Sequence, residues 1–135
     1  MPRGKPFPDI ELLLLHYFKL RQEPEMQACR FETDLPEDLK TTGCDVRINR
    51  ITGTNRSMFV DRPLVDIDVY GYDRDVVVAT ARMIQQIITF ELRGAHTPDG
   101  IIGETKTSNG PRWLPEKNQQ LSRWGATYEM SAHAA

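Results

Sequence analysis

The chain has 135 residues, of which 39% are hydrophobic and 27% are charged. This composition is typical of a globular protein and argues against a wholly disordered chain. Seventeen basic and nineteen acidic side chains leave a net charge of -2, so there is no global positive field to collect nucleic acid or anionic membranes.

The length fits one domain that spans residues 1–135 around one core. We expect residues 1–8 to be an extended N-terminal segment and residues 132–135 to be a flexible tail. The longest apolar run, residues 12–15, is far shorter than the roughly 20 residues that cross a bilayer. The N-terminus also lacks a signal-peptide pattern, which predicts synthesis and assembly in the cytosol without a membrane partner.

The first helix is expected over about residues 9–20. Asp9 can cap it, because a side-chain oxygen at this position accepts a backbone N–H of the first turn. The apolar stripe is wider than half of the circumference and comprises Ile10, Leu12, Leu13, Leu14, Leu15, Tyr17 and Phe18. Such a helix is mostly covered by protein, either by its own sheet or by a neighbouring subunit.

Two strands are expected next, over residues 29–33 and 44–52, with a turn at residues 34–38. The two cysteines, Cys29 and Cys44, fall on these strands and belong to no CxxC or CxxH pattern. Their spacing therefore favours reduced thiols. Residues 53–62 are polar and predict a projecting loop.

A third strand is expected from Pro63, because a first strand residue need not donate to the ladder. Val65, Ile67 and Val69 share one face of it by alternation. The other face carries Asp66, Asp68, Tyr70 and Tyr72. That second face is too polar for an ordinary core.

A long helix follows, with Asp73 and Asp75 as candidate N-caps. Its apolar residues keep the helical period over about five turns. Gly94 offers a left-handed stop at its end.

The remaining sequence predicts strands over residues 101–110 and 119–132, joined by a stiff connection at residues 111–118. Asn109-Gly110 is a turn signal at the start of that connection. The fold class predicted from all these elements is α+β, with an antiparallel or mixed sheet of four to five strands and two helices packed on one face.

No catalytic motif emerges from the search for reactive groups. The histidines lack HExxH spacing, the serines lack a GxSxG elbow, and the glycines form no phosphate cradle. We therefore expect no enzyme, no catalytic residue, no bound metal and no cofactor.

An acidic cluster is the one group of residues that suggests a metal-binding or catalytic site. It comprises Asp61, Asp66, Asp68, Asp73 and Asp75. Paired carboxylates can hold a divalent cation or act as an acid–base pair, which leaves a small metal-dependent hydrolase as an alternative. A solvated strand face with two helix caps is the favoured interpretation.

Aromatic side chains are the other conspicuous group, since they can stack nucleic-acid bases or anchor protein interfaces. Base-stacking sheets need interleaved basic residues, whereas Asp66 and Asp68 stand here instead. Tyr70, Tyr72, Trp113 and Trp124 are therefore candidates for interface anchors.

The C-terminal third also carries two distinctive motifs, Gly110-Pro111-Arg112-Trp113-Leu114-Pro115 and RWGATYEMSAH from Arg123. With the order of helices and strands, they resemble tail-terminator proteins of long-tailed, siphovirus-type phages of actinobacterial hosts. The resemblance implies a homohexameric ring in the neck of the virion, assembled in the host cytoplasm. It also implies that the ring caps the tail tube, ends its polymerisation and joins the head connector or stopper protein.

The resemblance implies that DNA passes through the ring without specific binding. The lack of excess basic charge suits such a channel. On this basis we expect some of the five aspartates to face the lumen. The loops at residues 53–62 and 95–103 are the candidates for docking onto the tube or the connector.

Another head–tail connector, head-completion or tail-tube protein remains an alternative. A tube subunit is expected to carry a long β-hairpin arm and a closing sheet. The sequence instead predicts long helices at both ends of a short sheet, which favours the terminator.

Overall fold

The computed structural model describes residues 6–21, 23–24, 28–55 and 59–134, with the backbone alone at residues 54 and 55. Its elements are α1 (Ile10–Lys19), β1 (Cys29–Glu32), β2 (Cys44–Asn55), β3 (Asp61–Gly71), α3 (Arg74–Ile87), the π-helical turn η1 (Ile88–Leu92), β4 (His96–Thr97), β5 (Gly100–Trp113) and β6 (Ser122–His133). No helix in the described part of the chain is long and apolar enough to cross a membrane.

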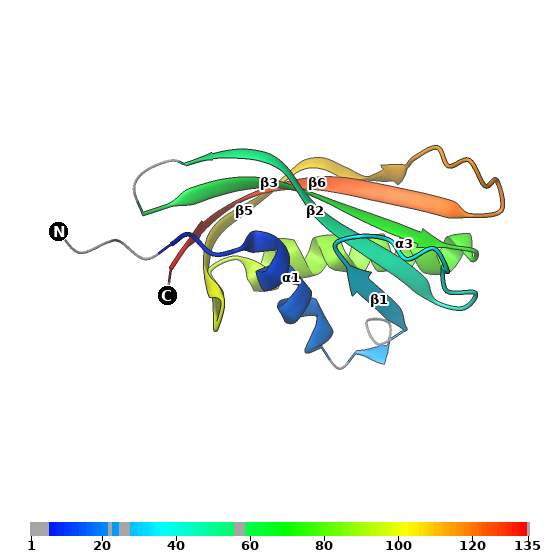
Figure 1. Cartoon of the computed structure of the whole chain (residues 1–135), viewed down its shortest axis with the longest axis horizontal. Helices are drawn as coiled ribbons and strands as arrows, with labels where there is room; N and C mark the ends of the chain where they lie inside the picture. The colour runs from blue at the N-terminus through cyan, green and yellow to red at the C-terminus, as the bar shows by residue number, and fades with distance from the viewer. Residues whose placement is uncertain (1–5, 22, 25–27, 56–58, 135) are drawn as a thin grey trace.

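Among the described residues, six strands form one curled sheet in the order β1-β2-β3-β6-β5-β4 (Figure 1). β1 runs parallel to β2, and the other neighbours are antiparallel. The sheet is therefore mixed, within the predicted α+β class. The predicted count of four to five strands is too low, because β4 has two residues and is too short to show alternation.

Both helices pack against the same side of the sheet, below it in Figure 1. The core between them joins apolar residues of α1 and α3 to the alternating residues of the central strands. Val65, Ile67 and Val69 of β3 all belong to it, as predicted. The opposite side of the sheet is covered by no helix in the described residues.

α1 begins where the sequence predicts it to begin. The Leu12 N–H donates to Asp9 Oδ1 at 3.2 Å, which confirms the N-cap. Glu11 then fixes the helix to the sheet, because its Oε2 accepts the backbone N–H of Arg50 at 2.8 Å. Leu12 and Leu20 stay 43% and 72% exposed, so the apolar stripe is wider than this subunit covers.

α3 settles the choice between two candidate caps. Asp73 accepts backbone N–H groups of Asp75 and Val76, whereas Asp75 lies in the first turn. At the other end, η1 continues α3, and Gly94 follows with a φ of +76°. Glycine adopts this left-handed conformation without a steric penalty, which confirms the predicted stop.

The predicted turn at Asn109-Gly110 is wrong, because β5 continues through it to Trp113. The register against β6 shifts on both sides of Asn109, so a bulge absorbs the two residues. The connection to β6 occupies residues 114–121 instead. The true hairpin is therefore longer than predicted.

The predicted C-terminal tail is wrong for residues 132 and 133. Ala132 is fully buried in β6 and pairs with both Asp61 and Ile102. At the other terminus, Pro8 is buried, and its ring occupies the space where a Gly100 side chain would lie. Residues 1–5 and 135 lie outside the described part of the chain.

Candidate assembly surfaces

The side of the sheet opposite the helices, here called the polar face, carries most of the charged strand residues. Alternation and register place there Arg47, Arg62, Asp66, Asp68, Glu104, Lys106, Arg112, Arg123 and Glu129. Cations and anions on this face nearly balance. Six of the nine form ion pairs with one another.

Asp68 is the centre of the polar face. Its Oδ2 accepts a hydrogen bond from Arg123 at 2.8 Å and lies 3.8 Å from an Arg47 nitrogen. The Arg123 guanidinium also sits over the Tyr70 ring, 5.4 Å from its centroid. Burial, and secondarily the negative charge of Asp68, raises the pKa of Tyr70.

Gly125 makes the close approach at this centre possible. Directly opposite Asp68 in the register, it leaves room for two side chains. A Cβ here would lie 2.3 Å from Asp68 Oδ1 and 2.6 Å from Leu114 Cδ1. Asp68 and Leu114 therefore occupy the space that a side chain at Gly125 would need.

A second group of charges lies further along the polar face. Arg62 contacts Glu129 at 3.2 Å and Glu104 at 3.6 Å, linking β3 to β6 and β5. Nearby, the Thr127 hydroxyl donates to Asp66 Oδ1 at 2.5 Å. These contacts tie β3 to β6 and β5 across the polar face.

The five predicted aspartates do not gather at one site. Asp66 and Asp68 share the polar face, whereas Asp73 and Asp75 lie at the exposed start of α3. Asp61 is only 1% exposed and faces the helix side, where Arg50 donates to both of its oxygens at 2.6 and 3.0 Å. Asp61 is therefore not available to line a channel.

A search of the described residues finds no group of three or more His, Cys, Asp or Glu side chains placed to hold a metal ion. In the predicted acidic cluster, Asp68 is engaged by arginines and Asp66 by Thr127. These partners compete for the carboxylate oxygens that a cation would use.

The predicted aromatic anchors differ in exposure. Tyr70 is only 4% exposed, so its ring is not a surface anchor. Trp124 is half-buried beneath Arg74, whose guanidinium lies 5.5 Å from the indole centroid. Tyr72 and Trp113 are 42% and 63% exposed, and these two remain candidates for contacts with another chain.

The predicted docking loops are smaller than the sequence suggests. Residues 53–55 belong to β2 and residues 61–62 to β3, while residues 56–58 lie outside the described part. In the second loop, β4 and β5 form a tight hairpin within residues 96–101. Phe59, within the first predicted loop, is 71% exposed.

Sequence reasoning did not find a groove on the helix side, here called the helix groove. The hollow of about 270 Å³ lies between Arg21 and Glu23, which follow α1, and Met83, Ile87 and Phe90 of α3 and η1. Arg21 binds both Glu23 and Glu91 across it. Phe90, which lines it, is 77% exposed, and Leu20, which precedes Arg21 in the chain, is 72% exposed.

A second hollow, of about 400 Å³, lies between α1 and the β4–β5 hairpin, and Leu20 is one of the residues that line it. His16 Nδ1 lies 2.9 Å from Asp99 Oδ2 at its edge. Each hollow is formed by segments that are far apart in the sequence, so no local sequence motif predicts it.

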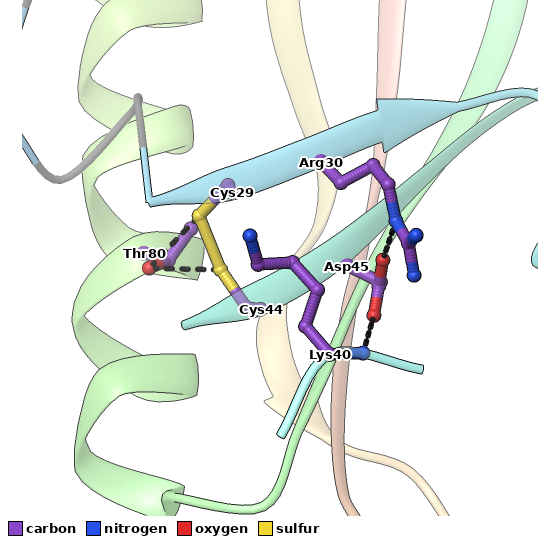
Figure 2. The surroundings of a disulfide bond; sticks show 6 residues. All are labelled: Cys29, Arg30, Lys40, Cys44, Asp45 and Thr80. Atoms are coloured by element: carbon purple, nitrogen blue, oxygen red, sulfur yellow. Dashed lines mark hydrogen bonds and ion pairs between the residues drawn. A yellow bond between two sulfur atoms is a disulfide. The ribbon is translucent and has the colours of Figure 1, made fainter. Parts of the chain in front are cut away.

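The structure joins Cys29 and Cys44 in a disulfide, which corrects the prediction of reduced thiols. Figure 2 shows the bond between β1 and β2, with Thr80 of α3 beside both sulfurs. The Thr80 hydroxyl lies 3.5 Å from Cys44 Sγ and 3.8 Å from Cys29 Sγ. The sequence lacks a signal for this pairing, because the two strands become neighbours only in the folded sheet.

The fold is similar to that of a chain in a solved structure described as "Virion of native gene transfer agent (GTA) particle". The TM-score is 0.63 at 10% sequence identity, and the match covers 89% of this chain and 92% of the other. At this identity the similarity establishes a shared fold. No family model matches the sequence, and a search of curated proteins also finds no match.

Proposed function

We propose that this chain is a structural protein of a phage-type virion. The observation that carries the proposal is the similarity of nearly the whole fold to a chain of a gene transfer agent virion. The coverage of both chains matters, because the match then concerns the fold as a whole and not a shared fragment. In this account the protein acts through assembly and is not an enzyme.

Within the virion, the role we propose is that of a tail terminator in the neck. The support is the sequence resemblance, whose two motifs occupy neighbouring strands in the fold. Residues 110–113 end β5, and residues 123–133 form most of β6. The proposed partners are copies of the same chain in a homohexameric ring, the tail-tube protein and the head connector or stopper.

The polar face is the surface that we assign to the lumen of this ring. Asp66 and Asp68 lie on it, and their oxygens accept hydrogen bonds from Thr127 and Arg123. Basic and acidic side chains are interspersed on this face, so it lacks the concentrated positive charge that holds DNA phosphates. DNA would therefore slide past it without specific binding.

Contacts between subunits are assigned to the exposed apolar side chains. Leu12, Leu20, Phe90 and Trp113 are all more than 40% exposed. A closed ring would bury side chains of this kind, which a lone subunit leaves in water.

A tail-tube subunit is the second candidate, and one observation favours it. β5 and β6 form a hairpin with strands of 14 and 12 residues, within a sheet of six described strands. The sequence predicted a short sheet, which argued against a tube subunit. The long hairpin removes that argument.

Electron microscopy of particles made without this protein separates the candidates. A terminator predicts tails that grow past their normal length. Normal-length tails that fail to join heads would assign the chain to another part of the neck, and complete loss of tails would identify a tube subunit. Intact, infectious particles with normal tails would contradict every virion role proposed here.

A further inference from the structure

β1 is a short edge strand with few attachments. It has four residues and pairs only with β2 among the described strands. Phe31 is its one fully buried anchor, stacked on Phe18 of α1 with ring centroids 5.2 Å apart. Parallel pairing over so few residues contributes little on its own.

The disulfide lies at the first residue of this edge. Cys29 begins β1, Cys44 begins β2, and the two are direct partners in the register. Cys44 is fully buried, whereas Cys29 is half-buried and lies nearer to solvent. A small reagent therefore reaches Cys29 first.

Other contacts bring the two sulfurs together without help from the bond. Arg30 donates to Asp45 Oδ1 at 2.6 Å, and the Lys40 N–H donates to Asp45 Oδ2 at 2.7 Å (Figure 2). These hydrogen bonds hold the start of β1 and the returning segment against β2. None of these contacts involves a sulfur atom, so they are available to hold the two strands together when the cysteines are reduced.

We propose that Cys29 and Cys44 form a redox latch, which closes after folding and fastens the β1 edge to β2. The cytosol keeps thiols reduced, so the subunit would fold and assemble with the latch open. Exposure to an oxidising medium outside the cell would then close it. Release from the cell rests on the proposed virion role, whereas formation of the bond after folding concerns the chain itself.

The oxidant in this proposal is a low-molecular-weight disulfide. The Cys29 thiolate attacks it, forming a mixed disulfide and releasing one small thiolate. The Cys44 thiolate then attacks the Cys29 sulfur and releases the second. The two cysteine protons go to the two leaving thiolates, and two electrons pass from the cysteine pair to the small disulfide.

The latch closes a loop with a sequence separation of 15 residues. A cross-link that closes such a loop restricts the unfolded conformations of the residues within it. We therefore expect its stabilising effect in β1 and in the segment from β1 to residue 43. The central strands β3 and β6 lie outside the loop. Their stability against local opening is expected to be independent of the latch.

Hydrogen exchange of the full-length protein tests the latch. The chain is treated with dithiothreitol or with oxidised glutathione, and intact mass then counts the thiol hydrogens. We expect a folded reduced chain that loses two hydrogens on oxidation. Closure should slow exchange of the Cys29–Glu32 amides by about tenfold or more, while β3 and β6 amides stay unchanged.

Cys29→Ser is the matched control, because serine keeps a small polar side chain beside Thr80 and the variant retains Cys44. It should exchange like the reduced protein under both conditions. The proposal is overturned if glutathione leaves both thiols free, or if closure leaves exchange in β1 unchanged. A reduced wild-type chain that fails to fold would also overturn it, because the bond would then be a requirement for folding.

Discussion

At the scale of single residues, the polar face depends on a glycine. Gly125→Ala should force Asp68 away from Arg123, because the new Cβ has no free space. We expect the free energy of unfolding to fall by about 1–3 kcal/mol, the usual cost of an overpacked site. Chemical denaturation measures the change.

Gly110→Ala is the control for this substitution. It is also a strand glycine without a positive φ, and the nearest heavy atom to its Cβ would be 4.0 Å away. Its effect should stay within about 0.5 kcal/mol. Equal losses in the two variants would mean that the crowding at Asp68 is not the cause.

The ion pair between Arg50 and Asp61 supports a second expectation. Asp61→Asn keeps the shape of the side chain but removes the charge that accepts two hydrogen bonds from Arg50. We expect a loss of about 2 kcal/mol in unfolding free energy, since hydrogen bonds to charged groups contribute about 1.5–3 kcal/mol. Thermal or urea unfolding detects a change of this size.

Asp75→Asn, at a fully solvated carboxylate on the same chain, should leave the unfolding midpoint nearly unchanged. If Asp61→Asn were equally silent, the buried pair would not stabilise the β2–β3 hairpin.

Residue environments were the least predictable feature of the sequence. Alternation correctly placed Asp66 and Asp68 opposite the core, whereas Asp61 was grouped with them only because it is nearby in the sequence. Asp61 is two residues before Pro63, where the sequence predicted a loop, so the alternation of the strand gave no side of the sheet for it. Extending the strand by two residues would have placed Asp61 on the same face as Val65.

At the scale of elements, the two helix caps give a controlled comparison. Asp73→Ala removes the acceptor for the Asp75 and Val76 N–H groups and should destabilise the protein by about 1 kcal/mol. Asp75→Ala removes a carboxylate that caps nothing and should cost less. Melting temperatures of the two variants provide the measurement, and the reverse order would refute the assignment of the cap.

The helices were predictable because caps and apolar period are local signals. α1 and α3 begin next to Asp9 and Asp73, and the stop at Gly94 follows from its freedom at positive φ. The end of β5 was harder to predict, because the dipeptide Asn109-Gly110 is compatible with both a turn and a bulge. Pairing with β6 decides between them, and pairing is not a local property.

At the scale of the whole molecule, strand order lay beyond the sequence. The β1–β2 pairing that joins Cys29 to Cys44, the contact of Arg21 with Glu91 and the two hollows all depend on that order. The same limit applies to surfaces. The sequence indicated an excess of apolar residues in α1, but only the fold shows which of them stay exposed.

The exposed apolar side chains at the end of α1 and in η1 predict that the protein associates with itself. Replacing both Leu20 and Phe90 by serine should leave the fold intact, because these side chains are 72% and 77% exposed. The double variant should shift the mass in solution towards the monomer, as measured by light scattering over a range of concentrations. Ile51→Ser, at another exposed apolar residue, is the control.

An unchanged mass for the double variant, with a wild type that associates, would place the subunit contact elsewhere on the surface. Loss of association in the control as well would indicate a general effect of removing apolar surface.

A reconstruction of the head–tail junction in the assembled particle tests the central claim most directly. The account predicts a ring of six copies of this chain on the last ring of the tail tube, with Asp66 and Asp68 turned towards the DNA channel. Density for this fold along the whole tube, or its absence from the particle, would contradict the account.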